Sequence, residues 1–286
     1  MKGPKLSVLT TCYNRQAYIS ECIESILNSS FQDLELVIVD DHSTDASWDI
    51  IQSYAAKDSR ILAHRNQENL GDYPNRNKAA SLASGTYLKY VDADDVIGHF
   101  FLDILVHSMD LFPQAGIGLS GGRTWPYPIF LEPHQAITQF YHGEHTAFNR
   151  SPLMSILRKS TFDDIGGFSG RQHSGDFELW HMMAANSGLL LLPSLAWVRT
   201  HPDQESQANR TDPRVNFRYL WLSLELLTTY HKDDQIALEY QLVQSKKKHI
   251  ARTILYGFRR HGYKGAVAMK NETKWSWKTV FKEAFQ

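Results

Sequence analysis

The chain has 286 residues, 42% hydrophobic and 21% charged, a composition typical of a globular protein with a sizeable core. Its formal net charge of −1 gives no indication of nucleic-acid binding. The two cysteines, Cys12 and Cys22, lack the spacing of a metal site or a disulfide framework, which favours a reducing compartment. No signal-peptide core and no run of about 18 apolar residues occurs, so we expect a cytoplasmic protein that meets a membrane only at its inner surface.

The first 120 residues alternate strand and helix patterns. Short apolar runs predict buried strands over 6–10, 34–39, 60–64, 86–91 and 116–120. Helical patterns separate them over 17–27, 45–54, 73–83 and 100–111. Ser43, Thr44 or Asp45 is expected to cap the second helix. This order of elements predicts an α/β fold with a mostly parallel, doubly wound sheet.

The second half of the chain gives weaker patterns. Residues 121–175 are rich in Pro, Gly, His and aromatic side chains, and we expect irregular structure there with one or two short strands. A helix is expected over 176–186 and an apolar strand over 189–192. Two or three helices should follow, over about 213–230 and 233–260, and the change in composition near 202–213 is the best candidate for a domain boundary.

Polar side chains follow four consecutive predicted strands. Ligands of an open parallel sheet bind beyond the carboxyl ends of its strands, so these residues are candidates for one binding edge. The residues are Thr11, Tyr13 and Asn14, then Asp40 and Asp41, then Asn66 and Asn69, and finally Asp92, Asp94 and Asp95.

The carboxylates of residues 92–95 form the strongest single signal. Three like charges in four residues repel one another, and a bound Mg²⁺ or Mn²⁺ would relieve that repulsion. An extended backbone would place Asp92 and Asp94 on the same side of the chain. The alternative is that these aspartates cap the helix that follows.

Each remaining candidate has a structural alternative. Tyr13 could stack on a base or pack at the sheet edge. Asp41 could accept hydrogen bonds from a base or ribose, or cap a helix. Asp176 stands where a helix is expected to begin, a position that itself favours Asp. Aromatic residues that could form a sugar platform or belong to the core are Trp125, Tyr127, Phe140, Tyr141 and Trp180.

Several motifs together resemble those of glycosyltransferase family 2, which has the GT-A fold. Residues 7–15 read SVLTTCYNR and resemble the opening SVIIPTYNR of the family, with Thr11 in place of its usual Pro. Residues 39–45 read VDDHSTD, and residues 68–71 read ENLG. Residues 92–95 read DADD and resemble the metal-binding DxD motif. The resemblance covers roughly residues 6–206.

This resemblance implies a site for a nucleotide diphosphate sugar. Thr11, Tyr13 and Asp41 would hold the base, usually uracil, and Asp92 would contact the ribose or the sugar. Asp94 would bind Mn²⁺ or Mg²⁺, and Arg76 would lie near the diphosphate. Asn14 and Asn69, which lie in the same motifs, complete the expected donor-binding set.

Two later elements extend the resemblance. Residues 165–168 and 175–180 read IGGF and GDFELW, and the family's catalytic base corresponds to Asp176. Gly175 stands where many members have Glu, although the branch that builds spore-coat polysaccharides shares the Gly-Asp pair. His201, in the segment VRTHPDQES, would reach the metal or the diphosphate.

The resemblance implies an inverting, metal-dependent glycosyltransferase that acts in polysaccharide or glycolipid biosynthesis. It would move a sugar from a nucleotide diphosphate sugar, expected to be a UDP-sugar, to a hydroxyl of a saccharide or of a lipid-linked acceptor. Residues 1–210 would form the catalytic domain, with 1–120 binding the nucleotide and 121–210 on the acceptor side, and 211–286 a helical extension. Two alternatives stay open: a nucleotidyltransferase that makes sugar nucleotides, and a binding protein of the same fold without activity.

The C-terminal segment is strongly basic. Residues 241–286 contain eleven Lys and Arg against two Glu, a net charge of +9 that leaves −10 on the rest of the chain. Because aromatic residues alternate with these charges, peripheral contact with an anionic membrane is one interpretation. Packing on the acidic remainder of the chain and homodimerisation are the others.

Overall fold

The computed structural model describes residues 3–120, 127–143, 146–171, 174–193, 213–230 and 236–285. The chain divides into two compact units, Met1–Arg199 and Thr200–Gln286. Two residues considered above, Trp125 and His201, lie outside the described residues.

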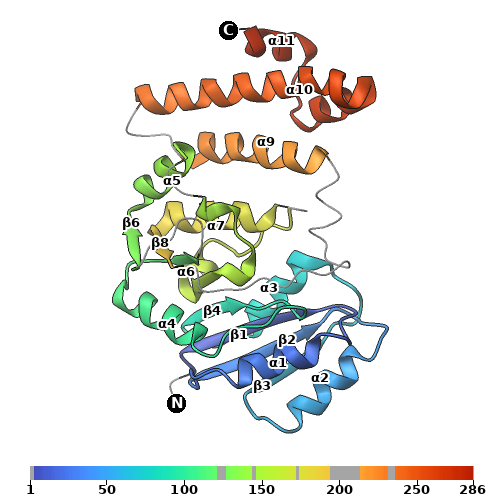
Figure 1. The fold of residues 1–286 in the computed structure, drawn as a ribbon, viewed down its shortest axis with the longest axis vertical. Coiled ribbons are helices and arrows are strands. Elements are labelled where there is room, and N and C mark those ends of the chain that lie inside the picture. The colour runs from blue at the N-terminus through green and yellow to red at the C-terminus, as the bar shows by residue number, and fades with distance from the viewer. Residues whose placement is uncertain are drawn as a thin grey trace. The chain divides into compact units, whose positions relative to one another are not determined.

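The first unit begins with the expected alternation of strands and helices (Figure 1). Its elements are β1 (Leu6–Cys12), α1 (Ile19–Leu27), β2 (Leu34–Asp40), α2 (Ser47–Ala55), β3 (Ile61–Arg65), α3 (Asp72–Leu82), β4 (Tyr87–Tyr90) and α4 (Phe101–Leu111). The predicted cap of α2 is wrong, because the helix begins at Ser47 and Ala46 holds the cap position. Asp45 nonetheless accepts a hydrogen bond from the Ser47 amide at 2.9 Å.

The second half of this unit holds more regular structure than its composition suggests. Its elements are β5 (Ile117–Ser120), β6 (Ile129–Leu131), α5 (Pro133–Tyr141), the 3₁₀ turns η1 (Ala147–Asn149) and η2 (Pro152–Met154), β7 (Ser155–Arg158), α6 (Lys159–Asp164), α7 (Gly175–Ser187) and β8 (Leu189–Leu192). The two short strands expected between residues 121 and 175 are therefore β6 and β7. The helices α5 and α6 were not predicted.

One eight-stranded sheet has the order β3-β2-β1-β4-β7-β5-β8-β6. The strands β1 to β4 run parallel to one another, and β5 is parallel to β8. Only β7 and β6 are antiparallel to their neighbours in this sheet of the described residues, so the expectation of a mostly parallel α/β sheet is confirmed. The chain moves outward from β1 to β3 and then returns to place β4 on the other side of β1, which creates a topological switch point between β1 and β4.

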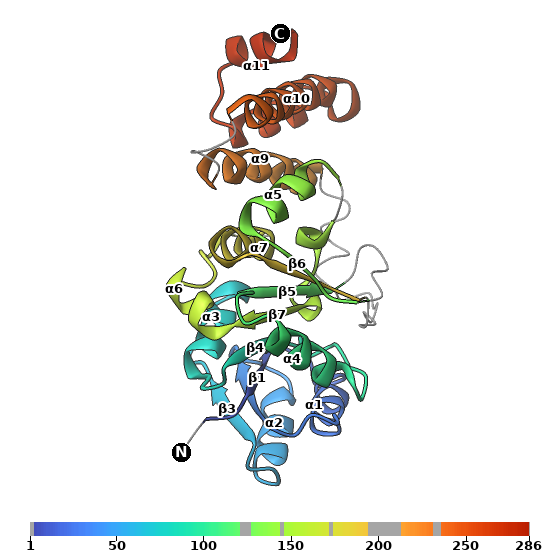
Figure 2. The same ribbon diagram turned by 90° about the vertical axis from the view of Figure 1, so that its left-hand side faces the viewer.

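Alternation along the strands sends side chains to two apolar layers. Leu6 and Val8 of β1 belong to a buried cluster that includes residues of α1, α2 and α4. On the opposite side of the sheet α3 packs against β1 and β2, and Figure 2 shows α3 across the strands from α1 and α4. The sheet is therefore covered on both faces, as its near-continuous apolar strands require.

The second unit is helical and contains its own core. It comprises α9 (Pro213–Tyr230), α10 (Ile236–Glu272) and α11 (Trp277–Phe285). Phe217, Ile254 and Val280 are among the buried residues that join the three helices. The predicted end of the long helix near residue 260 agrees with the non-helical backbone at Gly262 (φ 66°), and a further helical segment follows it within α10. Among the described residues, no helix is long and apolar enough to cross a bilayer.

Candidate active site

The switch point between β1 and β4 gathers most of the sequence-predicted residues. Thr11 lies near the end of β1, and Tyr13 and Asn14 follow that strand directly. Asp92 and Asp94 follow β4, the parallel neighbour of β1. Neighbouring parallel strands end at the same edge of a sheet, so the structure brings the two segments together.

The acidic segment after β4 is a turn. The Asp95 amide donates a hydrogen bond to the Asp92 carbonyl at 2.8 Å. The expectation that Asp92 and Asp94 lie on an extended backbone is therefore wrong, because the backbone turns between Asp92 and Asp95. Aspartate is favoured in such turns, which gives a local reason for the conformation.

Arginine side chains balance the charges of this turn. Arg76 Nη1 lies 2.7 Å from an Asp92 carboxylate oxygen, and Arg76 Nε lies 2.8 Å from Asp72. Arg15 Nε lies 2.9 Å from an Asp94 oxygen. The Arg76 side chain is only 8% exposed, whereas the side chains of Asp72 and Asp92 are 41% and 27% exposed, so a buried guanidinium holds two carboxylates that solvent still reaches. The arginines thus reduce the repulsion between the carboxylates of this turn. The sequence alone had suggested a bound metal for this role.

A buried lysine adds a further positive charge beneath the turn. Lys89 of β4 is fully buried, donates a hydrogen bond to the Leu153 carbonyl, and lies 5.1 Å from the centre of the Phe101 ring. Burial lowers its pKa to about 7, while the charges of Asp95 and Asp92 oppose that shift. The sequence did not reveal a role for Lys89, because its hydrogen-bond acceptor, the Leu153 carbonyl, lies 64 positions away.

The expected base-binding carboxylate, Asp41, anchors a neighbouring loop. One of its oxygens accepts hydrogen bonds from Asn66 Nδ2 at 2.7 Å and from the Leu70 amide at 2.9 Å. The other accepts one from the Gly71 amide at 2.9 Å. A carboxylate offers about four acceptor positions, so about one remains for a ligand. Asn69 belongs to the same loop and donates to the Asp41 carbonyl at 3.2 Å.

The segment after β1 is fixed by the segment after β2. Asn14 adopts a left-handed conformation (φ 52°), and its side-chain oxygen accepts a hydrogen bond from the Thr44 amide at 2.8 Å. The Asn14 amide donates to Ser43 Oγ at 2.9 Å. Tyr13 next to it is 45% exposed, which leaves its ring accessible for stacking. Asn14 therefore supports the loop that presents Tyr13.

Asp176 lies in the first turn of α7 and is partly buried. Burial raises the pKa of its carboxyl to about 6, whereas the Phe177 amide, which donates to its Oδ1 at 2.8 Å, and the charge of Arg76 favour the ionised form. This arrangement keeps the carboxylate mostly ionised at neutral pH and able to take up a proton.

Side chains of α3 connect Asp176 to the acidic turn. The Gly175 amide donates a hydrogen bond to Tyr73 Oη at 2.9 Å, which fixes the start of α7 against the start of α3. One turn further along α3, Arg76 pairs with Asp92 and also acts on Asp176 through its charge. The charge of Arg76 thus acts on Asp92 through a direct ion pair and on Asp176, 84 positions further along the sequence, through its field.

Not every sequence-predicted residue joins this site. Trp180 is fully buried and its Nε1 donates to the Arg150 carbonyl at 2.8 Å, so the hypothesis of a sugar platform is wrong for this side chain. Tyr127 is exposed. Conversely, Arg15, Asp72 and Tyr73 were not predicted as site residues; the i,i+4 spacing of Asp72 and Arg76 was the one available signal.

Comparison with known proteins places this site in a family. The model of the family described as glycosyl transferase family 2 matches residues 7–174, more than half of the chain. The chain belongs to glycosyl transferase family 2. An uncharacterized glycosyltransferase of Methanocaldococcus jannaschii is 40% identical over 203 residues, which are 65% of this chain and 67% of that protein. Against the first two curated relatives the chain spans 28% and 49% of their lengths.

Solved structures that are similar to this chain share its fold. TarS residues 1–349 of S. aureus in complex with UDP-GlcNAc superpose with a TM-score of 0.69 at 20% identity, covering 89% of this chain and 75% of that one. The mannosyltransferase PcManGT of Pyrobaculum calidifontis in complex with GDP-Man and Mn²⁺ gives a TM-score of 0.62 at 17% identity, covering 99% and 79%. The architecture is the GT-A fold.

Proposed function

We propose that this family 2 chain is an inverting glycosyltransferase that moves a sugar from a nucleotide diphosphate sugar to an acceptor hydroxyl. The observation that carries the proposal is the position of Asp176, a carboxyl with a raised pKa linked through Arg76 to the acidic turn at the switch point. The other expected functions, a nucleotidyltransferase and an inactive binding protein, are not favoured by the family match.

The donor site in this proposal consists of the residues after β1, β2 and β4. Tyr13 stacks on the base, and Asp41, which has about one acceptor position left, accepts a hydrogen bond from it. Uridine is the proposed nucleoside, as in the TarS complex, although PcManGT was solved with a guanosine nucleotide. Thr11, Asn14 and Asn69 support these contacts.

The residues fit a divalent metal that arrives together with the donor. The described residues contain no group of three His, Cys, Asp or Glu that could hold an ion by itself. A Mg²⁺-like ion is commonly held by one or two carboxylates and by the phosphates of its substrate, which is a role that Asp94 and Asp92 can fill. Such an ion would stabilise negative charge on the leaving diphosphate. His201, outside the described residues, is kept as a proposed ligand.

The bonding changes follow from the position of Asp176. Its carboxylate accepts the proton of the acceptor hydroxyl while the hydroxyl oxygen bonds to the anomeric carbon. The bond from that carbon to the donor phosphate breaks, and its electron pair leaves on the diphosphate. Arg76 and Arg15 hold positive charge at this edge of the sheet. A single displacement of this kind inverts the anomeric centre.

For the acceptor, only its chemical class is proposed. We propose a saccharide or lipid-linked hydroxyl acceptor, with residues 121–210 on the acceptor side and the basic helical segment 211–286 as an extension. Contact of that extension with a membrane and a homodimer remain proposals as well.

Donor binding tests the proposal before any acceptor is known. A panel of UDP- and GDP-sugars, titrated with and without Mn²⁺, should give tightest binding for a uridine nucleotide with Mn²⁺ present. Asp94→Ala should weaken the Mn²⁺-dependent binding by at least about tenfold, because losing a metal ligand costs at least as much as losing a group that orients one.

Asp33→Ala is the matched control, since Asp33 is exposed and precedes β2 at the opposite edge of the sheet. Its donor affinity should equal that of the unaltered chain. Equal affinities for Asp94→Ala and the unaltered chain would contradict the assignment of Asp94.

A further inference from the structure

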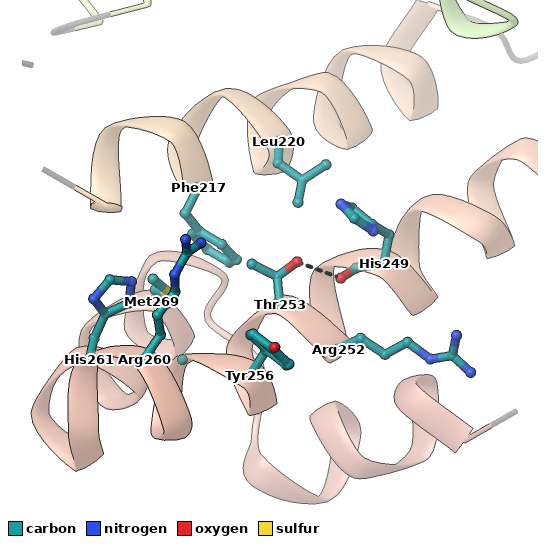
Figure 3. Close-up of a pocket in the computed structure, with 10 residues that line it drawn as sticks. Phe217, Leu220, His249, Arg252, Thr253, Tyr256, Arg260, His261 and Met269 are labelled. Carbon is teal, nitrogen blue, oxygen red and sulfur yellow. Dashed lines mark hydrogen bonds between the residues drawn. The ribbon is translucent and has the colours of Figure 1, made fainter. Parts of the chain in front are cut away.

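A cavity of about 560 Å³ lies within the second unit, between α9 and α10 (Figure 3). Phe217 and Leu220 of α9 and Met269 of α10 provide its apolar side chains. Its volume falls within the range of about 300–1,000 Å³ that is usual for small-molecule sites. None of its lining residues belongs to the proposed transferase site.

The bend in α10 creates this cavity. Gly262 adopts a left-handed conformation (φ 66°), which allows the second part of α10 to turn back toward the first. A Cβ at Gly257 would lie 3.2 Å from Met269 Sδ and 3.5 Å from Ala266 Cα, so the missing side chain allows the two parts to pack closely. The cavity is therefore lined by α9 and by the two parts of α10 that the bend brings together.

Cationic and titratable side chains surround the apolar lining. Figure 3 shows Arg260 and His261 at one end of the cavity and His249 at the other, with Tyr256 between them. Within the described part of the chain, no ion pair involves Arg260, although Arg218 of the same unit pairs with Glu272 at 2.9 Å. The guanidinium of Arg260 is thus available to an anion.

Exposed aromatic side chains lie on the same unit. Tyr256 is 61% exposed, Tyr263 69% and Phe285 78%. Aromatic and basic side chains together are typical of segments that contact the interface of a bilayer. A free anion would gain nothing from the apolar lining, and a neutral apolar ligand would gain nothing from the arginine.

We propose that this cavity binds a phosphate-headed lipid, whose phosphate contacts Arg260 and whose acyl chain lies against Leu220 and Tyr256. This site would hold the second unit at an anionic membrane surface. The proposal is independent of the sugar-transfer chemistry, because it involves neither Asp94 nor Asp176.

Calorimetric titration of the full chain with dihexanoyl phosphatidic acid, kept below its micelle concentration, tests the proposal. The unaltered chain should bind one lipid. Arg260→Glu should weaken binding by about tenfold or more, since it removes a charge-assisted hydrogen bond and adds a repulsive charge. Leu220→Trp, which fills the cavity without changing its charge, should abolish binding.

Lys264→Glu is the matched control, because Lys264 is exposed on α10, does not line this cavity, and its substitution changes the net charge equally. It should change the affinity by less than about twofold, and inorganic phosphate should not compete at equal concentration. Equal losses for Lys264→Glu and Arg260→Glu would overturn the proposal, as would absent lipid binding or equal binding of inorganic phosphate. A far-ultraviolet circular dichroism spectrum and a denaturant midpoint equal to those of the unaltered chain would show that Arg260→Glu is folded.

Discussion

Asp176 combines burial with a position next to positive charge. Burial raises the pKa of the carboxyl, the hydrogen bond from the Phe177 amide and the charge of Arg76 oppose this shift, and the resulting pKa is about 6. A general base works best when its pKa lies near the pH at which it operates. The residue therefore has the properties that the proposed proton transfer requires.

Replacing this carboxyl should stabilise the protein. Because the pKa of Asp176 is higher in the folded chain than its ordinary value of 3.8, ionisation opposes folding, and this cost is fully present above pH of about 6. Asp176→Asn should raise the free energy of unfolding at pH 7.5 by about 1–3 kcal/mol. Urea unfolding measures this gain, which should shrink as the pH falls toward 4. A variant less stable than the unaltered chain at pH 7.5 would contradict the account.

The same pKa predicts how transfer depends on pH. Below pH of about 6 the protonated Asp176 cannot accept a proton, so kcat/KM should fall about tenfold for each further pH unit. Initial rates with a saturating acceptor and limiting donor, from pH 5 to pH 8, measure this profile. A profile that stays level down to pH 5 would exclude Asp176 as the base.

For single residues, the sequence indicated which side chains gather at the site but not which partners they contact. The motif after β4 predicted Asp92 and Asp94 correctly as neighbours of the switch point. Their arginine partners come from the segment after β1 and from α3, and such long-range pairs leave no periodic pattern in the sequence. The same limit applies to Lys89.

The start of α7 depends on a close contact between two helices. A Cβ at Gly175 would lie 2.8 Å from atoms of the Tyr73 ring, so this position has no room for a side chain. The Tyr73 ring therefore explains why this chain has glycine at position 175, where many family members have Glu. The sequence showed this substitution, but the helix that causes it lies 102 positions away.

Substitution of Gly175 should therefore be costly. Gly175→Ala should lower the free energy of unfolding by about 1–3 kcal/mol, as is usual when extra atoms are forced into a packed contact. Denaturant unfolding measures the loss, and Tyr73→Ala in the same chain should recover part of it, because the two changes share one contact. Gly98→Ala is the control, since nothing lies within 4 Å of a Cβ there. Equal effects of Gly175→Ala and Gly98→Ala would contradict the contact.

The whole molecule divides into a part that local patterns predicted and a part that they did not. The elements from β1 to β5 follow the predicted strands and helices within a few residues, because each covers an apolar run bounded by turn residues. The insertion of β7 between β4 and β5 could not be predicted, since it depends on antiparallel pairing of Leu157 with both Leu88 and Ile117. The predicted helix end near residue 260 matches the bend of α10 at Gly262, whereas the helical segment after the bend was not predicted.

Each unit also contains a core of its own, so changes in one core should act locally. Phe217, Ile250 and Ile254 are buried in the second unit, whereas the residues of the proposed transferase site other than His201 belong to the first. The proposed transfer chemistry therefore lies in the first unit, with the Asp176 carboxylate on α7 as the proposed base and the donor at the switch point.

The most direct test compares donor hydrolysis and donor binding in the unaltered chain and in Asp176→Asn. Water can replace the acceptor hydroxyl, so release of nucleoside diphosphate can be measured without knowing the acceptor. The account predicts that Asp176→Asn lowers the release rate by about 10²-fold or more while the donor Kd changes by less than about threefold. Release at the unaltered rate by Asp176→Asn would contradict the account.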